Sequence, residues 1–83
     1  MPIITALCYA VEINKEIELK KLGDRIREIR LSKGLTQGEL ASKMDRDDYQ
    51  TIQRLETGNT NPTYSFLLEV CFGLDISMKE LFS

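Results

Sequence analysis

The chain has 83 residues, of which 42% are hydrophobic, and a formal net charge of −2, which together predict one small domain with a modest core. No apolar run approaches the roughly 20 residues that a membrane-spanning helix needs, and no basic region precedes the apolar N-terminus as in a secretory signal, so we expect a cytoplasmic protein. The sequence contains no histidine, and Cys8 and Cys71 lack the spacing of metal ligands, so we expect free thiols and neither a metal nor a cofactor.

Residues 1–13 are rich in β-branched and aromatic side chains. Their alternating apolar positions would share one face of a strand, although so short a run also fits a helix. A lone strand leaves backbone groups unpaired on both edges and needs a partner. We therefore expect residues 1–13 to form either a dimerisation arm that pairs with its copy, or an extension that folds over its own domain or stays disordered. Residues 14–83 are expected to form the folded domain.

A long helix is predicted to begin after Asn14, which can cap it, and to end at Gly34. Gly23 in its interior costs about 1 kcal/mol relative to alanine, unless close packing requires the missing side chain. The apolar face of this helix carries Leu19, Leu22, Ile26 and Ile29, and its basic residues are expected to form a solvated face at Arg25, Arg27 and Lys33.

Two short helices joined by a tight turn are predicted next. Thr36 and Glu39 form the T-x-x-E pattern of a capping box, which satisfies two backbone amides at the start of the first helix. The second helix can be capped by Asp47 or Asp48 and can end at Gly58. The side chains expected to turn inward are Leu40, Ala41 and Met44 from the first helix, and Ile52 and Leu55 from the second.

The outer face of the second short helix then carries amide and guanidinium groups. Such groups on a short exposed helix are suited to reading base edges in the major groove of DNA. The pattern therefore predicts a helix-turn-helix unit with its recognition helix at about residues 48–57. The side chains on or near this outer face are Tyr49, Gln50, Gln53 and Arg54.

After a polar turn at residues 59–62, whose groups suit phosphate oxygens as well as solvent, Thr63 can cap a helix that runs to Leu74. Ser77 and Glu80 form a second capping-box pattern before a last helical turn. The helix after Thr63 is expected to turn Leu67, Val70, Cys71 and Leu74 inward.

The charge distribution favours nucleic acid more than the net charge does. Residues 20–54 hold nine basic and six acidic side chains, a net charge of +3, and they include the predicted helix-turn-helix unit. A charge this small predicts weak non-specific binding to DNA and a strong dependence on dimerisation.

From residue 22 to residue 82 the chain resembles the XRE family of phage-repressor-like helix-turn-helix domains. The resemblance rests on the order and spacing of IREIRLSKGLTQ at 26–37, ELA at 39–41, IQRLETG at 52–58, NP at 61–62 and LF at 81–82. It implies an all-α, five-helix, lambda-repressor-like fold that binds double-stranded DNA.

The resemblance also implies roles for individual residues. Gln37 would contact a phosphate and brace the recognition helix, and Arg30 would form an ion pair with Glu56 that ties the first helix to the third. The hydrogen-bonding groups on the base edges add that Gln50 could pair with adenine and Arg54 with guanine through two hydrogen bonds. Each such contact contributes about 1–3 kcal/mol of discrimination against other bases. The predicted DNA-contacting set is Gln37, Lys43, Tyr49, Gln50, Gln53, Arg54, Asn59, Thr60 and Asn61.

The sequence departs from the family pattern in two regions. One extra residue between Ala41 and Gly58 alters the turn at 45–48, which also carries three aspartates. The start of the recognition helix, and with it the assignment of Tyr49, can therefore shift by one residue. Phe66 and Phe72 occupy positions that the family usually keeps polar. Exposed rings at these positions indicate a surface that is covered, either by residues 1–13 or by a second subunit. The alternative is that the two aromatic side chains are partly exposed and have no role.

The function predicted is a sequence-specific DNA-binding regulator, a repressor or controller protein, that binds a pseudo-palindromic site as a homodimer. The alternative is a protein-interaction module, such as an antitoxin that binds a toxin. An enzyme is disfavoured because no nucleophile–base arrangement is evident. Because nothing follows Ser83, we expect no ligand-sensing domain. If residues 1–13 are not the dimer contact, the other candidate is the final helical segment with Ile76, Met78, Leu81 and Phe82.

Overall fold

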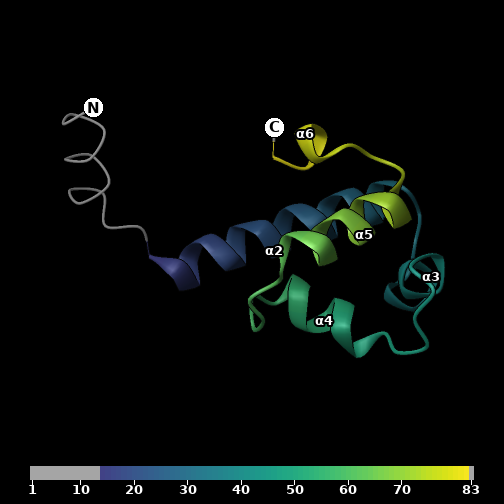
Figure 1. Cartoon of the computed structure of the whole chain (residues 1–83), viewed down its shortest axis with the longest axis horizontal. Helices are drawn as coiled ribbons and strands as arrows, with labels where there is room; N and C mark the ends of the chain where they lie inside the picture. Colours follow the sequence, from purple (N-terminus) through teal and green to yellow (C-terminus); the bar gives the residue numbers. More distant parts are fainter. Residues whose placement is uncertain (1–13, 83) are drawn as a thin grey trace.

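The computed structural model describes residues 14–82, which contain five helices and no strand (Figure 1). Helix α2 packs against α4, α3 packs against both α4 and α5, and α5 packs against α6. The predicted all-α architecture is confirmed, whereas the predicted arm at residues 1–13 lies outside the described residues. The helices are α2 (Lys15–Ser32), α3 (Gln37–Lys43), α4 (Gln50–Glu56), α5 (Tyr64–Leu74) and α6 (Met78–Leu81).

Four helices begin at the side-chain caps that the sequence predicts. The Asn14 side chain accepts a hydrogen bond from the Ile17 amide, and the Thr63 hydroxyl accepts one from the Phe66 amide. Full capping boxes open α3, at Thr36 and Glu39, and α6, at Ser77 and Glu80. Each such cap contributes about 1 kcal/mol to helix stability, so these starts are fixed by local chemistry.

The capping box of α3 also makes a small contribution to stability that depends on pH. The backbone amide of Thr36 donates to the Glu39 carboxylate, and this bond, helped by the Thr36 hydroxyl, lowers the pKa of Glu39. Because the folded-state pKa is the lower one, this contribution is present above the ordinary pKa of a glutamate. It is lost as the pH falls through the lowered pKa.

A single apolar core joins the five helices. All the side chains predicted to turn inward from α3, α4 and α5 are buried. Leu81 of α6 is also buried, with 1% of its surface exposed, so its predicted availability for a dimer interface is wrong. The reason is that α6 folds back onto α5 and uses Leu81 to complete the core. The core residues are Ile26, Ile29, Leu40, Ala41, Met44, Ile52, Leu55, Leu67, Val70, Cys71, Leu74 and Leu81.

Arg25 does not form part of a solvated face, as the sequence predicted. Its guanidinium donates to the carbonyl oxygens of Glu80 at 3.0 Å and Leu81 at 3.4 Å, and it pairs with Glu28 on its own helix. Carbonyl groups at a helix end lack partners within the helix, and a cation suits them. Arg25 therefore fastens α6 to α2.

Burial of Cys71 in the core raises the pKa of its thiol, with the nearby charge of Glu80 as a smaller cause. Its sulfur lies 3.3 Å from the sulfur of Met78 and forms no disulfide. Cys8 lies outside the described residues. Over residues 14–82, no helix combines the length and the apolar character that crossing a membrane requires.

Candidate nucleic-acid interface

The helix expected to read DNA begins later than the sequence predicted. Helix α4 starts at Gln50 and ends at Glu56, so it is shorter than the predicted 48–57, and neither Asp47 nor Asp48 is its N-cap. Tyr49 takes the N-cap position without a side-chain cap. Asp48 nevertheless accepts a hydrogen bond from the Gln50 amide at 2.8 Å, so it satisfies one of the free backbone amides from one position further out.

The late start follows from the turn after α3. Asp45 adopts a left-handed conformation with φ of 62°, and the Arg46 amide donates back to the Ala41 carbonyl at 2.9 Å. This is the pattern of a Schellman motif, in which the chain reverses direction directly after the helix. The residues that follow, Asp47 to Tyr49, are exposed and lie outside both helices.

The outer face of α4 carries the predicted polar side chains. Ile52 and Leu55 are almost fully buried, and the opposite side of the helix is exposed. Among residues 14–82, neither the Gln50 side-chain amide nor the Arg54 guanidinium has a hydrogen-bond partner. Both groups are therefore free to bind another molecule. The exposed side chains on this face are Tyr49, Gln50, Gln53 and Arg54.

A buried ion pair fixes the orientation of α4. The Arg30 guanidinium donates to the Glu56 carboxylate through Nε at 2.6 Å and Nη2 at 3.1 Å, and its Nη1 donates to the Leu35 carbonyl at 2.6 Å. Gln37 donates to the same carboxylate at 3.2 Å. Arg30 and Glu56 are 6% and 4% exposed. One carboxylate thus joins α4 to α2 and to the start of α3, and Gln37 lies beside the helix that the resemblance implied it would brace.

Close packing of α2 against α4 depends on Gly23. A Cβ atom at this position would lie 2.5 Å from the Leu55 carbonyl oxygen and 2.6 Å from that of Glu56. The missing side chain therefore lets the backbones approach at the point where the Arg30–Glu56 pair also connects them.

The loop after α4 places the predicted phosphate-contacting residues at one end of that helix. Gly58 has φ of 78°, and Asn59, Thr60 and Asn61 follow it beside the N-terminal part of α2. Asn59 is partly engaged, because its amide donates to the Thr57 hydroxyl at 3.1 Å. Asn59 and Asn61 are exposed, and Thr60 is half-buried.

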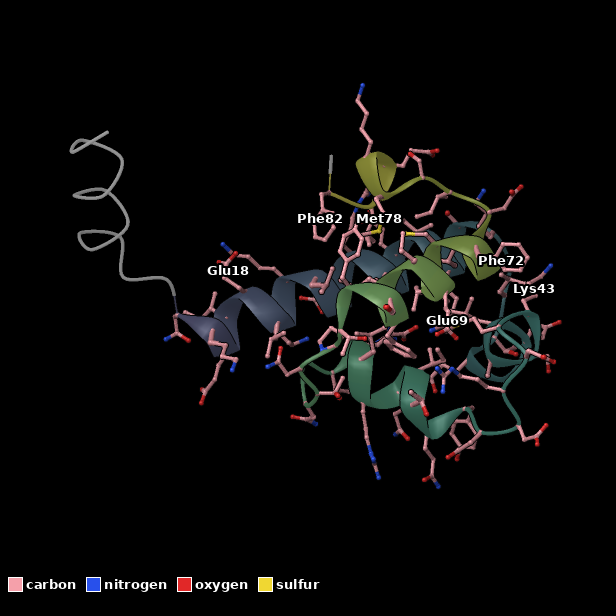
Figure 2. The ribbon with its side chains drawn as sticks, in the orientation of Figure 1. Glu18, Lys43, Glu69, Phe72, Met78 and Phe82 are labelled. Atoms are coloured by element: carbon pink, nitrogen blue, oxygen red, sulfur yellow. The ribbon has the colours of Figure 1, made fainter. Side chains whose placement is uncertain are left out.

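Lys43 does not lie with the other predicted contacts. It stands at the end of α3 and borders an apolar hollow together with Leu68 and Phe72 of α5 (Figure 2). Figure 2 shows Lys43, Glu69 and Phe72 at the end of α5 that approaches α3, away from the outer face of α4. The structure thus brings together the predicted residues of α4 and its following loop, and separates Lys43 from them.

Sequence reasoning missed Arg46 and misjudged Phe66. The ring of Phe66 is half-buried, not exposed, because the Arg46 guanidinium lies over it at 4.9 Å from the ring centre. Phe72 is 78% exposed, as the sequence predicted. A cation and a ring that lie 20 residues apart produce no local periodicity, so only their spatial contact reveals the pair.

Comparison with known proteins gives consistent matches. The helix-turn-helix family model matches residues 26–81. The crystal structure of the restriction-modification controller protein C.AhdI from Aeromonas hydrophila is 36% identical in sequence, with a TM-score of 0.75, and the match covers 80% of this chain and 98% of that one. Wild-type restriction-modification controller protein C.Esp1396I is also 36% identical, with a TM-score of 0.71 over 77% of this chain and 81% of that one.

No curated protein sequence gives a significant match. The family model nevertheless covers more than half of the chain, and C.AhdI aligns over nearly its whole length. This chain therefore belongs to the helix-turn-helix family, of the XRE type, and is a DNA-binding transcriptional regulator.

Proposed function

We propose that this regulator binds a pseudo-palindromic DNA site as a homodimer, with α4 in the major groove, and that it controls a restriction-modification system. The observation that carries the DNA-reading part is the free Gln50 amide and Arg54 guanidinium on a helix whose orientation is fixed by the Arg30–Glu56 pair. The similarity to two restriction-modification controller proteins supports the choice of system. The proposal involves no catalytic step.

Within this proposal the contacts divide into two classes. Gln50 pairs with adenine and Arg54 with guanine, each through two hydrogen bonds, and Tyr49 and Gln53 contact neighbouring base edges. Phosphates are contacted by the loop at Asn59, Thr60 and Asn61 and by the second N–H of the Gln37 amide, whose first is donated to Glu56, whereas Lys43 lies beside the apolar surface of α5. Base contacts set sequence preference, and phosphate contacts set affinity and salt dependence.

Replacement of Gln50 by alanine tests the base-reading role. Loss of a two-bond contact to adenine costs about 1–3 kcal/mol, so we expect affinity for the preferred site to fall by roughly 5- to 150-fold while affinity for random DNA stays unchanged. The preferred site is first obtained by selection from a random duplex pool, and both affinities are measured by mobility shift. Asn61→Ala is the control, because loss of a phosphate contact weakens both complexes alike. Equal losses for Gln50→Ala would remove this residue from the base-reading set.

The surface proposed for dimerisation is an apolar stripe on α5, formed by Tyr64, Leu68 and Phe72. These side chains are 66%, 45% and 78% exposed, and their spacing of four residues places them on one helix face. An exposed stripe of this kind on a small domain indicates a contact surface.

The stripe is suited to a second copy of the same chain. Its pattern is symmetric about Leu68, so two α5 helices that cross antiparallel at Leu68 bring Tyr64 against the partner's Phe72 twice. Lys43 and Glu69 border the end of the stripe that carries Phe72 (Figure 2). A two-fold pair also doubles the few base contacts that one short α4 can make.

Replacement of Leu68 by arginine tests this interface. Two buried guanidinium groups would face each other at the two-fold axis, so we expect the dimer to dissociate to monomers, measured by light scattering. Leu31→Arg is the matched control, since Leu31 is 55% exposed and lies on α2, away from the stripe. Deletion of residues 1–13 should leave the protein a dimer. A monomer after that deletion, together with a dimer in Leu68→Arg, would assign the interface to the N-terminal segment.

A second candidate function rests on the same apolar stripe, which would then hold a different protein, such as a toxin. The two functions differ in their response to salt. Titration of random duplex at about 50 mM and 200 mM salt should show binding that weakens steeply as salt rises, because phosphate contacts release counterions. Absence of binding at the lower salt concentration would contradict DNA recognition as the main task.

A further inference from the structure

The turn between α3 and α4 is attached to the rest of the domain through Arg46. Of residues 45–48, Arg46 is the one whose side chain is not fully exposed. Within residues 14–82, it is also the one member of this turn whose side chain makes a hydrogen bond or ion pair with a helix other than α3 and α4. The three aspartates on either side of it are exposed.

The guanidinium of Arg46 is held by α5 on two sides. It lies over the ring of Phe66, 4.9 Å from the ring centre, and its Nη2 donates to the Glu69 carboxylate at 3.2 Å. Its Nε is covered and has no hydrogen-bond partner among the described residues. One of its three nitrogens is thus bonded within the protein and a second is covered, which leaves this side chain poorly placed to bind a phosphate directly.

The first turn of α4 lacks buried side-chain hydrogen bonds of the kind that hold its last turn. At the end of the helix, Glu56 is locked by Arg30 and Gln37. At its start, the Tyr49 position has no side-chain cap, and within residues 14–82 the single side-chain bond to this turn is the exposed contact between Asp48 and the Gln50 amide. The place of the first turn therefore depends on the burial of Ile52 and on the preceding turn, and the preceding turn is tied to α5 by Arg46.

We propose that Arg46 is a positioning residue for base reading: it clamps the turn to Phe66 and Glu69 of α5 and thereby fixes the position of Gln50, without itself contacting DNA. This inference rests on the proposed DNA-reading role of α4. Sequence preference then depends on a contact made within the protein.

The test compares Arg46→Ala with the wild type on the selected site and on random duplex. A cation–ring contact and a half-exposed ion pair together account for about a tenfold effect, so we expect affinity for the selected site to fall about tenfold and affinity for random DNA to change less than about twofold. The ratio of the two affinities distinguishes positioning from loss of folded protein, since unfolding lowers both affinities by the same factor. Arg27→Ala, which removes an exposed arginine of α2, should leave the ratio unchanged.

Salt dependence separates positioning from direct contact. The slope of log affinity against log salt should be the same in Arg46→Ala and the wild type. A slope reduced in magnitude by about 0.9 would mean that one phosphate contact has been lost, and the proposal would be overturned. Glu69→Gln should change the affinity for the selected site in opposite directions under the two roles of Arg46. If Arg46 is a positioning residue, binding becomes weaker, because the clamp is loosened. If Arg46 contacts DNA directly, binding becomes tighter, because its guanidinium is freed and a carboxylate is removed.

A measurement without DNA keeps this inference distinct from the proposed function. In the free protein, exchange of the Gln50 and Gln53 amide hydrogens, which are donated to the Asp48 side chain and the Tyr49 carbonyl, should be faster in Arg46→Ala than in the wild type, with α2 unchanged. Unchanged exchange at these two amides would overturn the clamp whatever the DNA results. The wild-type protein could instead show no sequence preference while exchange is faster in the variant. That result would contradict the base-reading function, and with it the role of Arg46 in base reading.

Discussion

Replacement of Glu56 by alanine is expected to lower the free energy of unfolding by about 3–5 kcal/mol, the usual loss when one partner of a buried ion pair is removed. The change would leave the Arg30 guanidinium buried without its carboxylate and would take the acceptor away from the Gln37 amide. Urea denaturation followed by circular dichroism measures the loss. Because the same carboxylate orients α4, affinity for the preferred DNA site should fall as well.

Glu69→Ala is the matched control for this result. Glu69 also pairs with an arginine, Arg46, but its side chain is 48% exposed, so water replaces the lost partner and the expected cost is below about 1 kcal/mol. Burial, and not the mere presence of an ion pair, is the cause of the expected difference. Equally small losses in the two variants would show that Arg30 reaches solvent once Glu56 is gone.

Replacement of Gly23 by alanine is expected to destabilise the fold, although alanine is the better helix former. The new Cβ would lie 2.5 Å from the Leu55 carbonyl oxygen and 2.8 Å from the Glu56 carbonyl carbon. Both are backbone atoms, so α2 and α4 would have to separate. Such overpacking costs about 1–3 kcal/mol or more, which exceeds the gain of about 1 kcal/mol in helix propensity. Thermal unfolding measures the net effect.

Gly38→Ala makes the same change where there is space. Gly38 lies in α3, and the nearest atom to its Cβ position is the Thr36 hydroxyl oxygen at 3.9 Å. Here we expect unchanged stability or a gain of up to about 1 kcal/mol. The opposite signs of the two glycine variants would confirm that the α2–α4 approach sets the requirement at Gly23. A stabilising Gly23→Ala would mean that the two helices can move apart freely.

Much of the candidate interface could be predicted from residues close together in the chain. The exposed face of α4 followed from the burial of Ile52 and Leu55 three residues apart, which leaves Gln50 and Arg54 on the opposite side. The pairing of Arg30 with Glu56 is a different case. These residues lie 26 positions apart, so resemblance to a family implied the pair, and no local pattern did.

The start of α4 shows where local reasoning failed. Asp47 and Asp48 are both suitable caps, and the sequence could not choose against either. The structure places Tyr49 at the cap position because a left-handed Asp45 and the return of Arg46 to Ala41 set the path of the turn. The backbone geometry of a turn depends on where the next helix must pack, which side-chain preferences at the turn do not determine.

The sequence by itself determined where most helices begin and which faces they bury, because caps and apolar periodicity act within one or two helical turns. Tertiary structure alone decided that Arg25 fastens α6, that Leu81 belongs to the core, and that Arg46 covers Phe66. The contact of Arg25 with Glu80 and that of Arg46 with Phe66 each join residues at least 20 positions apart. Such contacts depend on the packing distance and angle between helices, and these are set by the whole core together.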